Sequence, residues 1–422
     1  MSLRGGPYLA LPPAVWILTS ALAGAAGAAP WLEHRLTGSA RVETRWFRES
    51  PAHADQGRHA SGFAAAPRLY FSDPEGRSLS VAPFFRYDSA DPRRTHADLR
   101  EAALLLFGEV GDGEWELRAG LDQVFWGVAE SQHLVDIINQ VDFVEHPDGE
   151  TRLGQPMAHL TWSGDWGAVE VFGLPLHRAR TFPGPSGRLR LPLVVNENRV
   201  EYESEAGARH LDLAARYSHG VGPADIGLSL FRGTSREPFF LLGAEPGGGP
   251  ILIQRYEQIR QAGLDVQLTT GSWLIKLEAI HRAGAPNRLG RDEDYAASVL
   301  GAEYTLYSVL GSTGDAGLLG EWSYDGRGPR ATPGRSPNTL ENDLFLGGRF
   351  ALNDVQSTEI LGGLLMDLER STRTLAIELN RRISGRWSLR LEAIDLIAID
   401  AADLHYPTRR DSFVDLGLSW NL

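Results

Sequence analysis

The segment from Leu36 to Trp46 reads LTGSARVETRW, and its small or apolar residues alternate with polar and charged ones. Successive side chains of a β-strand point to opposite faces, so this pattern predicts a strand with one apolar and one charged face. The same period of two recurs at 115–122, 211–218, 374–380 and 387–393. Such segments are about 9–12 residues long, which exceeds the usual strand of a globular sheet and suits a tilted crossing of a bilayer.

The composition excludes several classes of function. The 422 residues include 41 basic and 54 acidic residues, no cysteine, 47 glycines and 24 prolines. Without cysteine, the chain has no disulfide scaffold, thiol nucleophile or cysteine-ligated metal. The net charge of −13 argues against non-specific binding of nucleic acid, which requires a clustered basic surface.

Residues 1–28 have the pattern of a secretory signal peptide. Arg4 precedes an apolar stretch that starts at Ala14, and Ala26-Gly27-Ala28 fits a small-x-small cleavage site. An uncleaved membrane anchor is the alternative. In residues 29–422 the longest apolar run is the six residues 102–107, whereas a membrane helix needs roughly 20. We therefore expect residues 29–422 to form one exported domain, either soluble or inserted in a membrane as a β-barrel.

Turn signals divide the chain unevenly. Tight-turn sequences occur at 73–76, 111–113, 163–165, 270–272 and 384–386. Long polar connections cover 50–61, 127–156, 175–198, 233–250, 282–294, 325–342 and 398–411. Short turns at one end and long loops at the other are typical of a transmembrane barrel. We predict an all-β fold, a single antiparallel transmembrane β-barrel of about 18 strands (roughly 16 to 20). The segment 189–193 is ambiguous because Pro192 disfavours a central strand.

The segment from Ser412 to Leu422 resembles the C-terminal assembly signal of bacterial outer-membrane barrels. Asp415, Gly417 and Trp420 match its polar, glycine and aromatic positions, while Leu422 stands where Phe or Trp is commoner. The resemblance implies a location in the bacterial outer membrane and insertion by the barrel-assembly machinery through this strand. A soluble β-protein that also ends on a strand is the alternative.

The connection from Gly127 to Pro156 is long enough to suggest a function. Ser131 is a candidate helix cap. Apolar residues follow at helical spacing, and they are Leu134, Ile137, Ile138, Val141 and Val144. We therefore predict a short amphipathic helix in this loop.

Two successive loops have opposite charge. Residues 127–156 carry six acidic residues and one arginine, and residues 175–199 carry five arginines and one glutamate. Loops of this kind folded into a barrel would narrow its lumen and select solutes by charge and size. The predicted constriction residues are Glu130, Asp136, Asn139, Asp142, Glu145, Arg178, Arg180, Arg188 and Arg190. Alternatively, both loops stay on the outer rim, where arginines suit the phosphates of lipopolysaccharide.

The stretch from Trp126 to Gln140, together with 154–156, resembles a segment of uncharacterised proteobacterial outer-membrane barrels. It is more distantly similar to the alginate-export and putative-porin families, in which a Trp-Gly pair after a strand precedes an Asn-x-x-Asp element. Asn139 and Asp142 match that element. The resemblance implies porin-like transport and does not identify a solute.

No catalytic, metal or cofactor site is expected. The chain has no Gly-x-Ser-x-Gly or His-Glu-x-x-His motif, and Ser131 and His133 would point apart on a helix. We expect a channel for small hydrophilic solutes or oligosaccharides, with outer-membrane lipid and lipopolysaccharide around it. The alternatives are a barrel that docks a partner or polymer at its loops and a rim-located hydrolase. A homo-oligomer is compatible with each.

Overall fold

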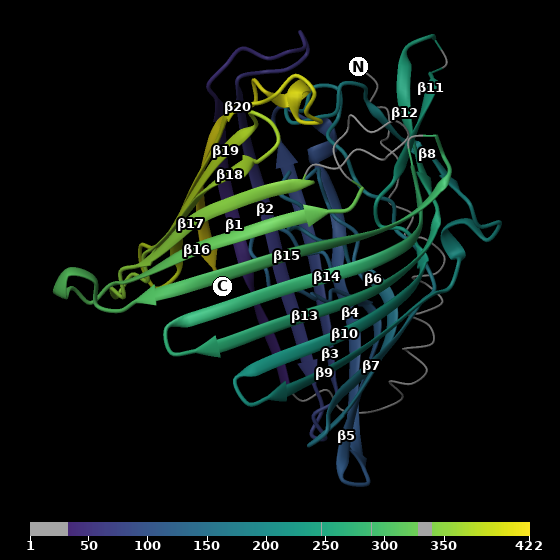
Figure 1. Ribbon diagram of the computed structural model, residues 1–422, viewed down its shortest axis with the longest axis vertical. Coiled ribbons are helices and arrows are strands. Elements are labelled where there is room, and N and C mark those ends of the chain that lie inside the picture. The colour runs from purple at the N-terminus through teal and green to yellow at the C-terminus, as the bar shows by residue number, and fades with distance from the viewer. Residues whose placement is uncertain (1–32, 246, 288, 328–339) are drawn as a thin grey trace.

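The protein is a closed antiparallel β-barrel. The computed structural model describes residues 33–245, 247–287, 289–327 and 340–422, and in these ranges eighteen strands form one sheet. Successive strands pair around the ring and β21 pairs with β1, which closes it (Figure 1). The predicted all-β barrel of about 18 strands is confirmed. The expected signal peptide, 1–28, lies outside the described residues and stays a prediction.

The barrel strands are long, from 8 residues in β7 to 15 residues in β1. The first nine are β1 (Glu33–Phe47), β2 (His59–Ser72), β3 (Ser78–Asp88), β4 (His96–Val110), β5 (Gly113–Asp122), β6 (Gln155–Gly164), β7 (Gly167–Leu174), β9 (Asp212–Val221) and β10 (Ala224–Thr234). The other nine are β13 (Gln258–Thr270), β14 (Trp273–Pro286), β15 (Asp292–Leu306), β16 (Asp315–Asp325), β17 (Asn342–Ala351), β18 (Glu359–Asp367), β19 (Arg373–Arg382), β20 (Trp387–Ala398) and β21 (Phe413–Asn421).

A small second sheet lies among the loops. It contains β11 (Phe239–Ala244), β12 (Pro250–Tyr256) and β8 (Val195–Tyr202), and β8 runs parallel to β12. The helical segments within the described ranges are single 3-10 turns at Pro92–Arg94, Gly207–Arg209, Val309–Gly311 and Tyr406–Thr408. The ambiguous segment 189–193 is not a strand, and Leu189 adopts a positive φ of 62°. No helix in the described part of the chain has the length and apolar character to cross a membrane.

The connections differ at the two ends of the barrel. All five predicted tight turns lie at one end, where they join β2–β3, β4–β5, β6–β7, β13–β14 and β19–β20. Most connections at the other end are longer, and the longest of them span 123–154 and 175–211, with β8 in the second. This asymmetry agrees with the sequence pattern.

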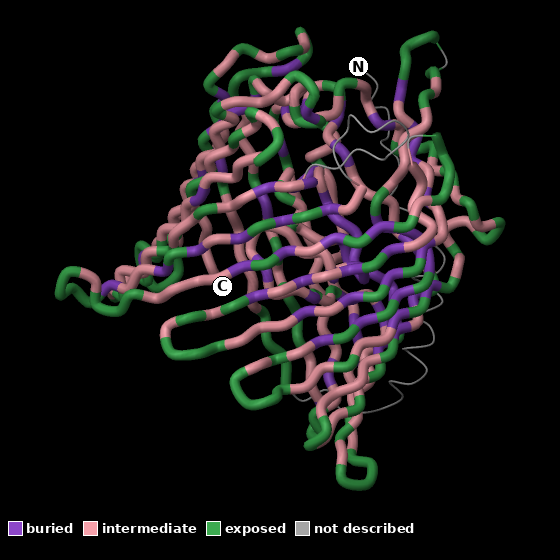
Figure 2. The backbone as a smooth tube through the Cα atoms, in the orientation of Figure 1, coloured by how far each residue is buried: buried purple, intermediate pink, exposed green. Residues whose placement is uncertain are grey.

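The two faces of the wall reverse the distribution of apolar and polar residues that is usual in a soluble protein. Leu228 and Leu230 on β10 are 51% and 63% exposed on the outside, whereas Ser229 between them is buried. On β14, Lys276 and Glu278 are buried within the barrel. Figure 2 shows buried and exposed residues alternating along these strands. An apolar outer wall around a polar lumen is the arrangement that a lipid bilayer requires.

Aromatic residues mark both rims of this apolar wall. Outward-facing side chains near the short turns include Trp162, Trp273 and Trp387, and those near the long loops include Trp46 and Trp322. Tryptophan at two levels of a barrel wall is typical of the two membrane–water interfaces.

Candidate functional site

The connection between β5 and β6, residues 123–154, folds into the barrel, and we call it the lumen loop. Its side chains Trp126, Val135, Ile137 and Ile138 are at most 3% exposed. They form a core with apolar residues that point inward from the wall, namely Phe172, Ala214, Phe231, Ile259, Ile280 and Tyr295. Each fully buried side chain of this size contributes about 1.5–3 kcal/mol. The loop is therefore held against the inner faces of β7 to β15.

Two wall carboxylates bind the backbone of the lumen loop. Glu278 of β14, which is fully buried, accepts N–H groups from Val128 at 2.7 Å, Ala129 at 2.9 Å and Val135 at 3.1 Å. Glu321 of β16 accepts the N–H of Glu130 at 2.8 Å, and it also accepts both the N–H and the hydroxyl of Ser131. These carboxylates replace the partners that an irregular buried backbone would otherwise lack.

The predicted helix in this loop is wrong. Residues 134–144 contain no helix, and Val141 instead pairs with Arg152 as an isolated bridge. Ser131 does not cap a helix because its hydroxyl binds Glu321. The apolar spacing that suggested a helix arises because several faces of an irregular chain pack on the wall. Bonds to Glu278 and Glu321 satisfy amides that would otherwise start helical turns.

Gly127 explains the Trp-Gly pair at the start of the loop. Its φ is +150°, and a Cβ at this position would lie 3.0 Å from Glu278 Oε1 and 3.1 Å from His133 Nδ1. A larger residue would push the chain away from the carboxylate that binds the next two amides. The glycine thus allows the loop to turn into the lumen beside β14.

The predicted polar residues of the lumen loop hold it in place. Asn139 accepts the N–H of Val124 and donates to the carbonyls of Asp122 and Leu153. Asp142 is bound by Arg100 at 2.5 Å and by the hydroxyl of Thr181 at 2.5 Å. Both side chains are at most 2% exposed, so they are structural parts of the loop.

Asp136 and Glu130 also have partners. Burial raises the pKa of Asp136 to about 6, although Arg152 Nη2 lies 2.8 Å from its carboxylate. Glu130 faces β14 and β17, where Lys276 is 3.6 Å and Arg349 is 2.9 Å from its oxygens. Neither residue lines the cavity that the loop leaves open.

A charged cavity of about 540 Å³ remains between the edge of the lumen loop and the far wall, and we call it the chamber. Its loop side is formed by Glu145, His146, Asp148, Glu150 and Thr151. Its other side is formed by Arg41, Glu43, Arg45, Arg86, Arg94, Glu378, Asn380, Arg390 and Glu392, which come from β1, β3, the β3–β4 connection, β19 and β20. Of the nine predicted constriction residues, all of them described, only Glu145 lines it.

The arginines of the chamber come from the wall. Arg45 Nε and Arg41 Nη2 both lie 3.1 Å from the Asp415 carboxylate. Arg390 lies 2.8 Å from Glu378 and remains 32% exposed. Arg86 is buried between Glu43 and Glu145, 2.7 Å from the latter. These cations face the three acidic residues Glu145, Asp148 and Glu150 of the loop edge, which creates a field across the chamber.

His146 connects the loop edge to the wall. Its Nδ1 lies 2.8 Å from Asp148 on the loop, and its Nε2 lies 2.9 Å from Glu392 on β20. Burial alone lowers the pKa of His146, but the two carboxylates outweigh it and raise the pKa above its ordinary value. The raised pKa favours the protonated imidazole, which in that form bridges two anions across one side of the chamber.

The arginine-rich connection does not face the acidic loop across a gap. Arg178 donates to the carbonyl of Gly154 and lies 2.8 Å from Asp98. Arg180 donates to Gln140 and to the carbonyl of Arg236. Both residues fasten the lumen loop to its neighbours.

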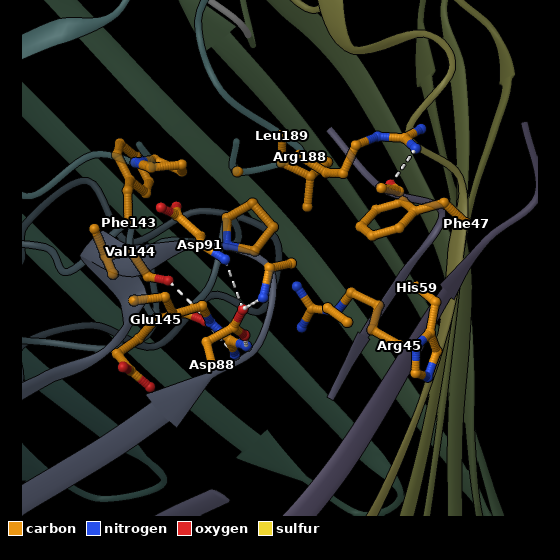
Figure 3. Close-up of a pocket in the computed structure, with 17 residues that line it drawn as sticks. Arg45, Phe47, His59, Asp88, Asp91, Phe143, Val144, Glu145, Arg188 and Leu189 are labelled. Carbon is orange, nitrogen blue, oxygen red and sulfur yellow. Dashed lines mark hydrogen bonds and ion pairs between the residues drawn. The ribbon is translucent and has the colours of Figure 1, made fainter. Parts of the chain in front are cut away.

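Residues 175–194, which we call the mouth loop, extend to the opposite side of the barrel mouth. Figure 3 shows Arg188 over the ring of Phe47, with a guanidinium-to-centroid distance of 4.2 Å. Arg188 is buried and lies 2.6 Å from Asp411 in the β20–β21 connection. Arg190 binds carbonyls of its own loop, including that of Pro185 at 3.0 Å. The mouth loop thus ties together connections from distant strands.

One group of side chains has the donor types of a metal site. His96, Asp142 and Glu145 present ligand atoms within 4.8 Å of one another. Arg100 and Arg86 already bind the two carboxylates at 2.5 Å and 2.7 Å. Guanidinium groups at these positions oppose a further cation, so the cluster is better described as an ion-pair network.

Comparisons with known proteins found structural likeness only. No family model matches the sequence, and no curated protein is similar to it. A variant of the porin of Rhodopseudomonas blastica is 11% identical, with 92% of this chain and 100% of that chain covered and a TM-score of 0.42. A structure described as "Asymmetric conductivity of engineered proteins" is 9% identical over the same shares, with a TM-score of 0.43. Scores this low do not establish a common topology, so function is inferred from the chain's own residues.

A sequence signal for the docking site of the lumen loop does exist. Most strands alternate apolar and polar residues, whereas Leu228–Phe231 and Leu277–Ile280 have apolar residues on both faces. The inward members, Phe231 and Ile280, contact the loop. Apolar residues at lumen positions therefore indicate which part of the wall is covered from inside.

Proposed function

We propose that the protein is a porin-like channel of the bacterial outer membrane, through which small hydrophilic solutes or oligosaccharides diffuse. The observation that carries the proposal is the chamber, a charged space left between the inward-folded lumen loop and the wall of β1, β19 and β20. Opposed loop carboxylates and wall arginines are suited to filtering solutes by size and charge.

The surroundings belong to the same proposal. The apolar wall with aromatic rims fits lipid on one leaflet and lipopolysaccharide on the other. We further propose that the barrel-assembly machinery recognises β21, and that the protein forms homo-oligomers in the membrane. We also propose kinship to uncharacterised proteobacterial barrels and, more distantly, to the alginate-export and putative-porin families, on the basis of the Trp126-Gly127 pair with Asn139 and Asp142.

The alternatives are less well supported by the geometry. Ser131 and His133, the nearest serine–histidine pair of the loop, bind different groups, because Ser131 donates to Glu321 and His133 lies 3.0 Å from Glu150. A nucleophile needs its hydroxyl bound to the base. A barrel that only docks a partner at its loops would not need an open chamber inside it.

The proposal is tested with purified, refolded protein in planar bilayers. A diffusion channel gives discrete conductance steps at neutral pH, and liposomes that contain it swell in small sugars but not in large ones. A folded barrel, identified by its heat-modifiable gel mobility, that gives neither steps nor swelling would refute a channel function.

A further inference from the structure

Two arginines on the outer wall have no counter-ion among the described residues. Arg232 of β10 and Arg260 of β13 are exposed and directly opposite each other in the register of these strands. Neither guanidinium forms a hydrogen bond or ion pair with any residue in the described ranges. Like charges directly opposite each other in a sheet are destabilising. An unpaired cation pair within a membrane-facing wall therefore calls for an anion from outside the chain.

The surroundings of the pair are apolar. Leu213, opposite Arg232 on β9, is 51% exposed, and Leu230 on the next rung of β10 is 63% exposed. Ala262 stands one rung below Arg260 and pairs with His281, which also faces outward. The three basic side chains therefore border a surface suited to acyl chains.

The carboxylates near this surface are already engaged. Glu203 accepts the N–H of Gln258 at 2.7 Å, Glu257 binds Arg255 at 2.6 Å, and Asp294 accepts the N–H of Gly284 at 3.2 Å. Elsewhere on the outer wall, Asp395 is matched by Arg48 at 3.1 Å. The Arg232–Arg260 pair differs because no acidic residue in the described ranges binds either guanidinium, and Asp265 of β13 is paired with Arg216.

The position along the barrel axis identifies the leaflet. Arg232 and Arg260 lie at the ends of β10 and β13 that adjoin the long connections, opposite to the tight turn at 271–272. In Figure 1 these two strands lie side by side in the wall. In an outer-membrane barrel the long loops face outward, so the pair lies at the level of the outer-leaflet headgroups.

We infer that Arg232 and Arg260, with His281 below them, bind a phosphate of a phosphorylated glycolipid in the outer leaflet while its acyl chains cover Leu213 and Leu230. Two guanidinium groups can bind one phosphate through paired N–H donors. The inference rests on the proposed membrane location but not on conductance.

The test uses the detergent-solubilised, folded full-length barrel and lipid A, the phosphorylated glycolipid of that leaflet, as probe. Bound lipid is counted by native mass spectrometry. The double variant Arg232→Gln/Arg260→Gln should bind lipid A about tenfold or more weakly than the unaltered protein. The control Arg199→Gln/Arg209→Gln removes two exposed arginines of the loops and should bind like the unaltered protein.

Two further arms identify the ligand. Dephosphorylated lipid A should bind as weakly to the unaltered barrel as lipid A binds to the double variant, and inorganic phosphate should not compete at equal concentration. The inference would be overturned if the double variant bound lipid A as tightly as the unaltered protein does. It would also be overturned if the unaltered protein bound dephosphorylated lipid A as tightly as lipid A. Conductance is measured on the same samples, so a barrel that binds lipid A without conducting would refute the channel and leave the site intact.

Discussion

At the scale of single residues, the chamber is controlled by few accessible charges. Arg390 is one of the more exposed of its arginines, at 32%, and it faces the loop acids Asp148 and Glu150. A unit charge roughly 8 Å away in water is worth about 0.5 kcal/mol to a passing ion. Arg390→Gln should therefore raise the preference for cations over anions by about twofold.

The reversal potential in a salt gradient measures this preference. Arg209→Gln is the matched control, because Arg209 is exposed in the connection before β9 and does not line the chamber. An unchanged reversal potential in Arg390→Gln would mean that ions pass elsewhere.

His146 makes the closure of the chamber dependent on pH. Its folded-state pKa lies above the ordinary value of about 6.5, so the bridge between Asp148 and Glu392 is complete below that pH. It is lost as the pH rises through the raised pKa. Conductance and current noise should therefore increase on the alkaline side, and His146→Gln should remove this dependence. A pH profile that is the same in both proteins would contradict this role.

Glu278 should matter for its hydrogen bonds more than for its charge. Glu278→Gln places an amide NH₂ against loop N–H groups, and each buried donor left unpaired costs about 1–3 kcal/mol. We expect open-channel noise and faster proteolysis within 123–154. Glu303→Gln is the control, because Glu303 also faces inward from β15 but forms no bond to the lumen loop. Equal noise in both variants would assign the effect to charge alone.

At the scale of elements, the lumen loop is stabilised by apolar contacts with the wall. Ile138 is fully buried, and Ile→Ala at such a site costs about 2–5 kcal/mol. Ile138→Ala should loosen the loop and speed its cleavage by added protease while the barrel stays folded. Val355→Ala, in a short turn where Val355 is 83% exposed, should change nothing. Cleavage at equal rates would contradict the docking of the loop.

The elements also show what the sequence can and cannot predict. The period of two identifies the strands because every strand has one lipid face, and the tight turns follow from Gly and Asp residues. The lumen loop is harder, because its backbone partners, Glu278 and Glu321, are more than 140 residues away. A helical spacing of Leu134 to Val144 therefore predicted a helix that tertiary bonds replace.

The site shows the same limit. Loop charge indicated an acidic constriction, and Glu145 does line the chamber. The charge pattern predicts the opposing cations in the next loop, 175–199. In the structure they are instead Arg41, Arg45 and Arg390 of the wall. The alternation along each strand does indicate which arginines point inward. The sequence does not show that the pairing of β1 with β21 brings β1, β19 and β20 together across from the loop.

At the scale of the whole molecule, one sheet separates an apolar exterior from a lumen that the chain itself partly fills. The lumen loop occupies the side of β7 to β16 and leaves the chamber against β1, β19 and β20. The mouth loop spans the entrance. The pore should therefore be much narrower than an empty barrel of about 18 strands.

The claim that the lumen loop narrows the pore is tested most directly by the single-channel conductance before and after the loop is removed. Residues 127–152 are replaced by a short Gly-Ser linker between β5 and β6, and folding of both proteins is checked by heat-modifiable mobility. The account predicts small, charge-selective steps from the unaltered protein and steps several times larger, with weak selectivity, from the shortened one. Equal conductance in the two proteins, or no conductance in either, would contradict it.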